Sequence, residues 1–326
     1  MPTSRAIPAD GRNRRFHFDR FEVNSRAMGA GAAPARRIGI DLGGTKIEGV
    51  VVDAEQRIVY RHRIATESAR GYVHILDRIL LMVERLRCEA PECAVIGMGT
   101  PGAVSTRDGT MKNCNTTCLN GRRLREDLEA RLGLEIRIEN DANLFALAEA
   151  VAGAGRDAAL VFGGILGTGI GGGIVYRGEL WRGPQHLAGE WGHHSIDPNG
   201  PSCYCGQRGC VEAFIAGPAV EAQYRARASH AVAMSEIVAG FRSGEPVATQ
   251  VFRDFLDRFG RSVANLIDIL DPDVIVLGGG LSNIDELYTL GREAVARHVL
   301  NDELRTPIRR NQLGDSAGVI GAALLC

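Results

Sequence analysis

Three cysteines and two histidines lie within one short stretch, GEWGHHSIDPNGPSCYCGQRGCVEAF, which runs from Gly189 to Phe214. Nine residues separate the first of these histidines from the first cysteine, and a C-x-C and a C-x4-C spacing follow. Four nitrogen and sulfur ligands within 18 residues are typical of a closed tetrahedral zinc site. A disulfide-bonded loop is the alternative, but clustered cysteines in a chain without a secretory signal more often hold a metal. The predicted zinc ligands are His193, Cys203, Cys205 and Cys210.

Three glycine-rich loops follow apolar stretches and have the composition of phosphate-binding loops. In the first, DLGGTK, Gly43 and Gly44 allow positive φ and let backbone N–H groups approach an anion. Asp41 at its start is placed to hold a magnesium ion through water, although a tight hairpin turn is the alternative for this motif alone. The other two loops lie in LGTGIGGGIVYRG (166–178) and VLGGGLSN (276–283). The candidate ATP and Mg²⁺ contacts are Asp41, Gly43, Gly44, Thr45, Lys46, Gly167, Thr168, Gly169, Gly279 and Gly280.

These loops do not belong to the two best-known nucleotide motifs. The chain has no G-K-[ST] sequence, which excludes a Walker A loop, and the first loop leads into a strand, which excludes the dinucleotide-binding fingerprint.

Asn140 and Asp141 lie where the strand pattern of RIEN gives way to the helical pattern of DANLFALAEA. A carboxylate at a helix N-terminus is stabilised as the anion by the helix dipole and by free N–H groups. An ordinary N-cap is the alternative, since Asn and Asp are both common there. The junction alone therefore leaves two interpretations open, a helix cap and a group that accepts a proton.

The composition of the chain excludes several classes of protein. It has 326 residues, a formal net charge of −1 and 45% hydrophobic residues, so we expect no nucleic-acid or membrane partner. No apolar run approaches the roughly 20 residues needed to span a bilayer. Residues 1–35 lack an apolar signal sequence and a periodic pattern, so we predict a cytoplasmic protein with a disordered N-terminal extension.

Strand and helix patterns alternate along the rest of the chain. Residues 37–64 predict three short strands that are separated by turns. An apolar face over residues 75–86 predicts a helix, and FRDFLDRFGRSVANLIDIL (252–270) predicts a long amphipathic one. A short apolar helix in GVIGAALL (318–325) closes the chain. This alternation predicts an α/β architecture.

Three such loops, each after an apolar strand, resemble the two-halved ATPase fold of sugar kinases, heat-shock ATPases and actin. Within that superfamily, residues 37–326 resemble the ROK family of bacterial sugar kinases and repressors. The chain reproduces the zinc pattern of that family, G-H-x9-C-x-C-G-x-x-G-C-x-E, which assigns His193 to the metal and leaves His194 outside it.

The resemblance implies a fold and its boundaries. The fold is α/β, with two lobes of the actin-like ATPase type, ribonuclease-H-like sheets and an active-site cleft between the lobes. The implied small lobe is 36–139 plus 314–326, and the implied large lobe is 140–313 with a zinc loop over 189–212.

The resemblance also implies roles for individual residues. Asp141 is the general base that deprotonates a sugar hydroxyl, and the zinc does no chemistry but orders the loop that carries Glu190 and Glu212. The implied sugar contacts are Gly102, Asn115, Asn140, Asp141, Glu190, His193 and Glu212. ATP, Mg²⁺ and a structural Zn²⁺ are the implied cofactors, and a homodimer is the implied assembly.

The leading hypothesis is an ATP-dependent hexose kinase that converts fructose to fructose 6-phosphate. KNCNTTCLNG (112–121) resembles the corresponding segment of ROK fructokinases, and N-acetylglucosamine and glucose are the second and third sugars in our ranking. A ROK repressor is disfavoured, because only 36 residues precede the first strand and a winged helix-turn-helix needs more. A non-catalytic sugar sensor and a polyphosphate-using glucokinase are further alternatives.

Overall fold

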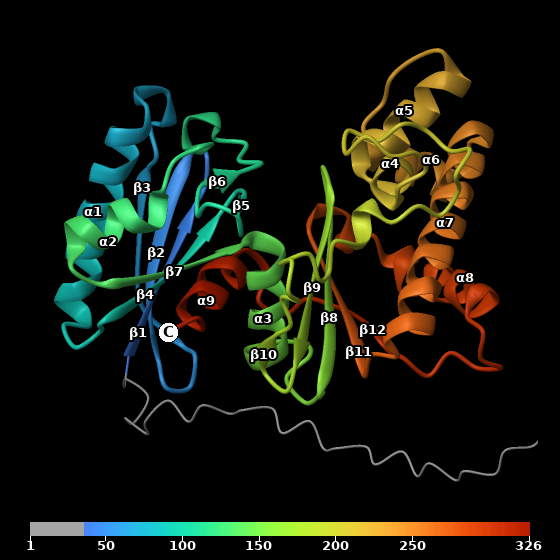
Figure 1. Ribbon diagram of the computed structural model, residues 1–326. Coiled ribbons are helices and arrows are strands. Elements are labelled where there is room, and N and C mark those ends of the chain that lie inside the picture. Colours follow the sequence, from blue (N-terminus) through green and yellow to red (C-terminus); the bar gives the residue numbers. More distant parts are fainter. Residues whose placement is uncertain (1–35) are drawn as a thin grey trace, which may run out of the picture. The chain divides into compact units, whose positions relative to one another are not determined.

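The computed structural model describes residues 36–326, in which two five-stranded sheets are accompanied by helices (Figure 1). The disorder predicted for residues 1–35 lies outside the described residues. The strands are β1 (Arg36–Leu42), β2 (Lys46–Asp53), β3 (Ile58–Ala65), β4 (Val95–Thr100), β5 (Ala103–Val104), β6 (Met111–Lys112), β7 (Glu135–Asn140), β8 (Leu160–Leu166), β9 (Ile170–Tyr176), β10 (Glu179–Leu180), β11 (Val274–Gly278) and β12 (Ile308–Arg310). The α-helices are α1 (Tyr72–Glu89), α2 (Leu124–Leu132), α3 (Asp141–Ala152), α4 (Val211–Ile215), α5 (Gly217–Ala228), α6 (Met234–Ser243), α7 (Pro246–Leu270), α8 (Leu290–His298) and α9 (Ala317–Ala323).

The two large sheets share one arrangement. In the first, the order is β3-β2-β1-β4-β7, where β1 to β3 are antiparallel neighbours and β4 and β7 continue parallel to β1. In the second, the order is β10-β9-β8-β11-β12, where β8 to β10 are antiparallel neighbours and β11 and β12 continue parallel to β8. Each sheet is therefore a three-stranded meander extended by two parallel strands, and the predicted α/β class is confirmed.

Helices α3 and α9 pack against each other and against the two sheets. Helix α3 packs on β8 and β9, and α9 packs on β1, β2 and β4. Glycine allows this close approach, because a Cβ on Gly97 of β4 would lie 1.7 Å from the carbonyl oxygen of Ala322. A Cβ on Gly321 of α9 would lie 2.1 Å from the carbonyl oxygen of Leu144. Since α3 follows β7 directly, its first residue, Asp141, lies at the edge of the first sheet where the parallel strands end.

Glu149 of α3 is a carboxylate with no exposed surface. Its oxygens accept hydrogen bonds from the backbone N–H groups of Ala154 (2.8 Å), Gln312 (3.1 Å) and Leu313 (2.9 Å). The last two residues lie between β12 and α9, so this side chain links α3 to the segment that leads into α9. A buried charge costs free energy unless hydrogen bonds replace its hydration, and these backbone donors replace it.

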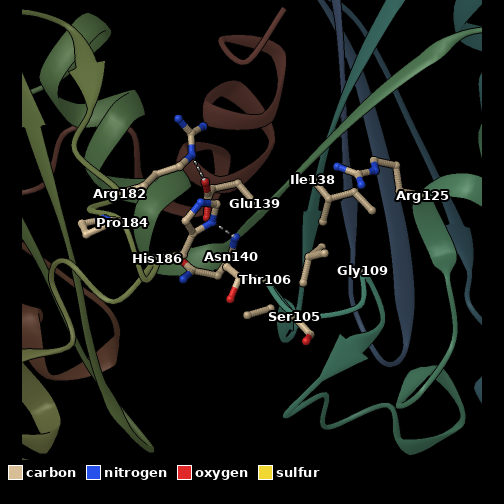
Figure 2. Close-up of a pocket in the computed structure, with 12 residues that line it drawn as sticks. Ser105, Thr106, Gly109, Arg125, Ile138, Glu139, Asn140, Arg182, Pro184 and His186 are labelled. Atoms are coloured by element: carbon tan, nitrogen blue, oxygen red, sulfur yellow. Dashed lines mark hydrogen bonds and ion pairs between the residues drawn. The ribbon is translucent and has the colours of Figure 1, made fainter.

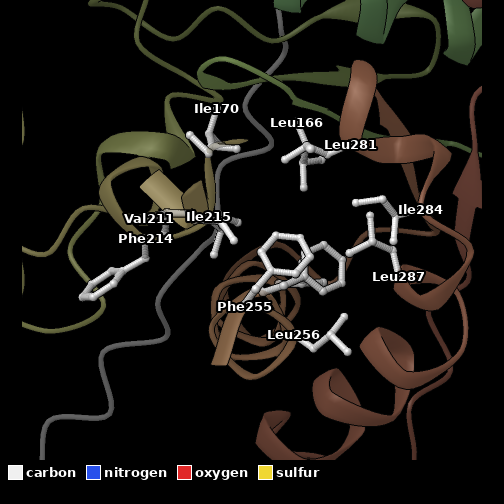
Figure 3. Packing of buried hydrophobic residues seen from close by; sticks show 14 of the residues in the cluster. Leu166, Ile170, Val211, Phe214, Ile215, Phe255, Leu256, Leu281, Ile284 and Leu287 are labelled. Carbon is white, nitrogen blue, oxygen red and sulfur yellow. The ribbon is translucent and has the colours of Figure 1, made fainter. Parts of the chain in front are cut away.

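One apolar cluster lies beside the second glycine loop (Figure 3). Leu166 and Ile170 flank that loop at the end of β8 and the start of β9, and both are buried. Val211, Phe214 and Ile215 of the short helix α4 belong to the same cluster. Burial of side chains of this size stabilises a fold by about 1.5–3 kcal/mol each. The loop is therefore anchored at both of its ends.

The predicted strands and helices are found, with one boundary displaced. Helix α7 begins at Pro246 rather than near Phe252. Glu245 caps it by accepting a hydrogen bond from the backbone N–H of Val247, and proline is well tolerated in the first turn of a helix. Within residues 36–326, no helix has the combination of length and apolar character that crossing a membrane requires.

Replacing Glu149 with Gln should lower the free energy of unfolding by about 1–3 kcal/mol, because an NH₂ group would then face backbone N–H donors. For a domain of this size the loss corresponds to a fall in Tm of roughly 2–10 °C, which differential scanning calorimetry measures. Glu84→Gln changes an exposed carboxylate of α1 and serves as the control, with almost no change in Tm. Equal Tm values for the two variants would contradict the role given to Glu149.

Candidate active site and metal centre

The junction between β7 and α3 holds the predicted pair of polar residues. Asn140 is the N-cap of α3, and its Oδ1 accepts a hydrogen bond of 2.8 Å from the backbone N–H of Asn143. Asp141 is the first residue of the helix, and its Oδ1 accepts from the backbone N–H of Ala142 at 2.9 Å. The Asp141 side chain is accessible to solvent, yet the surrounding protein reduces its hydration and raises the pKa of its carboxyl. The cap and the exposed acid are thus two neighbouring residues.

Asp41 lies near Asp141. It faces Gly99 in the parallel register of β1 and β4, close to the carboxyl ends of these strands. Burial raises the pKa of Asp41 to about 6, and the negative charge of Asp141 contributes to the same shift. A carboxylate whose proton affinity is raised by a neighbouring carboxylate is a favourable place for a divalent cation, because oxygen ligands suit Mg²⁺. The structure therefore brings together the predicted magnesium ligand and the predicted base.

The first glycine loop is a hairpin turn between β1 and β2, in which the backbone N–H of Gly43 donates to the carbonyl of Lys46 at 2.9 Å. Gly43 and Gly44 do not adopt the positive φ that glycine allows. The need for glycine is steric instead. A Cβ on Gly43 would lie 2.9 Å from the Lys46 carbonyl oxygen, and one on Gly44 would lie 3.3 Å from Oγ1 of Thr116. Thr45 and Lys46, beside them, are exposed.

The second and third glycine loops adjoin each other. Gly279 has a φ of 79°, and a Cβ there would lie 2.3 Å from the carbonyl oxygen of Leu166. A Cβ on Gly167 would lie 3.9 Å from the backbone nitrogen of Gly280. The remaining predicted nucleotide contacts of these loops, Thr168 and Gly169, are exposed. The two loops together present open backbone on one surface, as a phosphate-binding site requires.

The predicted sugar contacts of the first sheet also adjoin each other. A Cβ on Gly102 would lie 2.4 Å from Sγ of Cys114, so the 112–115 segment packs directly against Gly102. Asn115, next in the chain, is exposed. Cys114 is buried, and its small side chain makes this close packing possible.

Glu190 lies among the other charged groups of the site. Reduced hydration raises its pKa, the carboxylates of Asp141 and Glu212 raise it further, and His193 and Lys112 act in the opposite direction. These four groups must therefore lie within electrostatic range of Glu190. Lys112 was absent from the predicted site, although the lysine that opens the KNCNTT segment is a visible signal in the sequence.

A cavity of about 410 Å³ borders Asn140 (Figure 2). Ser105 and Thr106 line it from the turn after β5. Arg182 and His186 line it from the segment that follows β10. The cavity thus has polar side chains from segments attached to both large sheets, next to a predicted sugar contact.

An ion pair on the wall of this cavity also links the two sheets. Nε of Arg182 donates to Oε2 of Glu139 at 2.6 Å, and Oε1 of Glu139 accepts from Nδ2 of Asn143 at 2.9 Å. Glu139 immediately precedes Asn140, so the pair fixes the backbone next to the predicted base. This pair was absent from the predicted site, because its partners lie 43 positions apart in the sequence and no motif connects them.

The four predicted zinc ligands converge. Their ligand atoms all lie within 4.8 Å of one another. Sγ of Cys203 lies 3.6 Å from Nδ1 of His193, and Sγ of Cys205 lies 3.6 Å from Sγ of Cys210. Zn–S and Zn–N bonds of normal length in a tetrahedron place such atoms about 3.6–3.8 Å apart. The donor set and its spacing therefore fit a structural zinc ion, with Nδ1 as the ligand atom of His193.

The loop that carries these ligands is tied to the rest of the protein at several points. Glu212 accepts a hydrogen bond of 2.7 Å from the backbone N–H of Ile170, directly after the second glycine loop. His194, which is outside the group of ligands, lies 2.8 Å from the carbonyl oxygen of Trp191 and 3.3 Å from Nδ2 of Asn265 in α7. The loop thus connects the candidate metal centre to a glycine loop and to the longest helix described.

Comparison with known proteins gives consistent results. The sequence pattern of the ROK family matches residues 37–326. The N-acetyl-D-glucosamine kinase of Pasteurella multocida (strain Pm70) is 36% identical over 304 residues, which cover 89% of this chain and 98% of that relative. The ROK hexokinase of Thermus thermophilus has a TM-score of 0.81 and 35% identity, covering 89% of this chain and 97% of its own. A ROK family glucokinase from Streptomyces griseus, solved in complex with glucose and AMPPNP, has a TM-score of 0.71 and 32% identity, covering 89% and 99%.

These similarities extend over nearly all of the described residues. The predicted actin-like ATPase fold is confirmed, since the solved relatives are ROK sugar kinases whose structures match 89% of this chain. The chain therefore belongs to the ROK family, within which it is similar to sugar kinases along almost its whole described length.

Proposed function

We propose that the protein transfers the γ-phosphoryl group of ATP to a hydroxyl group of N-acetylglucosamine or a closely related N-acetylated hexosamine. The observation that carries the kinase part is the position of Asp141, an accessible acid at the start of α3, close to Asp41 at the end of β1. Phosphoryl transfer needs an acceptor for the hydroxyl proton beside a cation site, and this pair supplies both.

The choice of sugar rests on the relatives. Fructose, the first choice from the sequence, is not confirmed, and the N-acetylglucosamine alternative fits better, because several bacterial N-acetyl-D-glucosamine kinases are 35–36% identical to this chain. An N-acetyl group needs space and a mixed apolar and polar surface. The cavity next to Asn140 offers Ala103 and Val104 beside Ser105 and Thr106, which is a surface of that kind.

In the proposed reaction, the Asp141 carboxylate accepts the proton of the sugar hydroxyl while the oxygen of that hydroxyl attacks the γ-phosphorus of ATP. The bond between that phosphorus and the β–γ bridging oxygen breaks, and ADP leaves. Asp141 suits this role, since a raised pKa increases its proton affinity. Asp41 would hold Mg²⁺ through water, and the ion would neutralise charge on the phosphate oxygens.

The remaining predicted residues would bind rather than react. The backbone of the three glycine loops would contact the phosphates of ATP, chiefly at Gly44, Gly169 and Gly280. Asn140, Glu190 and Glu212 would contact sugar hydroxyls. A zinc ion on His193 and the three cysteines would hold the loop that carries Glu190 and Glu212, and would do no chemistry.

The proposal is tested by kcat/KM for N-acetylglucosamine, N-acetylgalactosamine, N-acetylmannosamine, glucose, mannose and fructose with Mg-ATP, measured by coupled ADP release. We expect an N-acetylated sugar to lead by at least about tenfold, since a mispaired polar group in a site costs about 1–3 kcal/mol. A lead for fructose would overturn the choice of sugar and restore the first hypothesis. Sugar binding without ADP release would indicate a sugar sensor. Turnover with polyphosphate but not with ATP would show that polyphosphate is the phosphoryl donor.

Asp141→Asn should lower kcat by about 10²–10⁴-fold while leaving the affinity for sugar nearly unchanged, because it removes the proton acceptor and keeps the shape. Steady-state kinetics and calorimetric titration of the sugar measure the two quantities. Asp157→Asn changes an exposed acid in the loop after α3 and should behave as the wild type. Turnover of the Asp141 variant within a few-fold of wild type would exclude this base.

Elemental analysis of the purified protein should find one zinc per chain, and Cys205→Ser should lose both the metal and most of the affinity for sugar. The physical reason is that metal binding and the folding of the loop are coupled, and the loop carries two sugar contacts. Cys88→Ser, at an exposed thiol of α1, should keep the zinc and the affinity. A metal-free preparation with full activity would contradict this assignment.

A further inference from the structure

Tyr204 lies between two of the zinc ligands, in the sequence Cys203-Tyr204-Cys205, and neither the zinc pattern nor the proposed reaction uses it. Its side chain is 83% exposed, the largest exposure of any aromatic side chain among the described residues. An aromatic ring left in water forgoes the free energy that burial would provide. The ring is therefore available to a ligand that would cover it.

One hydrogen bond holds Tyr204 in place. Its Oη lies 3.0 Å from Nε2 of His193, and the two rings meet edge to face with centroids 5.1 Å apart. Nδ1 of His193 points at Sγ of Cys203, so Nε2 is the nitrogen on the side away from the metal centre. With Nδ1 on a metal, Nε2 carries the hydrogen and donates it to Oη. This donor is the one that a bound sugar hydroxyl would use.

The acids assigned to the sugar lie near the same ring. Glu190 begins the short turn that contains His193, and the backbone N–H of His193 donates to the Glu190 carbonyl at 3.2 Å. Glu212, at the start of α4, follows the predicted zinc ligand Cys210 by two residues. An exposed aromatic ring, an imidazole donor and two carboxylates thus adjoin one cluster of predicted metal ligands.

We propose that Tyr204 is a sugar-binding residue that covers the bound sugar, its ring lying against the C–H groups of the pyranose or of its N-acetyl methyl. The inference rests on the proposed function. A sugar in the pyranose form has apolar C–H faces and a polar rim, and aromatic rings are suited to the first while carboxylates bind the second. Sugar binding exchanges the Oη···Nε2 hydrogen bond for one from Nε2 to a sugar hydroxyl. The contacts with His193 are the ones that this exchange would replace.

The test uses the full zinc-loaded chain and the variants Tyr204→Phe, Tyr204→Leu and Tyr204→Ala. Calorimetric titration gives Kd for N-acetylglucosamine and for glucose, and elemental analysis gives the zinc content. We expect Tyr204→Phe to bind within about threefold of wild type, because it keeps the ring. Tyr204→Ala and Tyr204→Leu should bind about five- to tenfold more weakly at unchanged zinc content, because they lose it. A larger loss for N-acetylglucosamine than for glucose would place the ring on the acetamido group, and an equal loss would place it on the pyranose.

Gln207→Ala is the matched control, since Gln207 is exposed on the same loop and bonds Cys203 through its backbone carbonyl. Tyr204→Ala and Tyr204→Leu that bind like this control would overturn the inference. A loss of zinc in Tyr204→Phe would also overturn it, because the hydroxyl would then serve the metal centre by orienting His193. If wild-type protein neither binds nor phosphorylates any of the sugars, the proposed function fails; normal wild-type activity with unaffected variants removes the Tyr204 inference alone.

Discussion

The arrangement of the site depends on one buried charge. Glu149 has no exposed surface and is compensated by backbone N–H groups of Ala154, Gln312 and Leu313. Two of these donors belong to a segment 163 and 164 residues further along the chain, so the carboxylate fixes α3 against the chain that enters α9. A misplacement of α3 would leave that charge without hydrogen bonds inside the protein, which is costly. Because Asp141 is the first residue of the same helix, the hydrogen bonds of Glu149 also constrain the position of Asp141.

A second constraint acts on the glycine loop between β8 and β9. The loop with the candidate zinc ligands is continuous with α4, whose apolar residues are buried beside Leu166 and Ile170. Glu212 at the start of α4 also binds the backbone N–H of Ile170. The second glycine loop is therefore held by apolar packing and by a charge-assisted hydrogen bond. In the proposed function, metal ligation, sugar contacts and phosphate contacts would therefore be coupled, since all three would act on this one connected segment.

Much of the fold and of the site follows from local sequence. The strand-to-helix junction at Asn140, the hairpin around Gly43 and the spacing of the four zinc ligands are all set by neighbours in the chain. The ion pair between Glu139 and Arg182 could not be predicted, because its partners lie far apart in sequence. The same holds for the hydrogen bonds that Glu149 accepts from Gln312 and Leu313. Helices such as α5 and α6 were missed for a related reason. Their residues become a buried face only once they pack together and, in both cases, against α7.

The buried acid Asp41 lowers the stability of the fold at neutral pH. Asp41 has a pKa near 6 in the folded protein against 3.8 for an unperturbed group, so the folded form binds more protons than the unfolded chain within that window. Stability therefore falls as the pH rises through this window, because ionising Asp41 opposes burial and the charge of Asp141. Each pKa unit corresponds to about 1.4 kcal/mol. A fold selected only for stability would replace such a group. In the proposed function the same charge would favour binding of a divalent cation, which would remove the repulsion between Asp41 and Asp141. The bound cation, and not the carboxylates themselves, would then attract the phosphates of ATP. The carboxylates that oppose folding at neutral pH would thus be the ones that hold the cation.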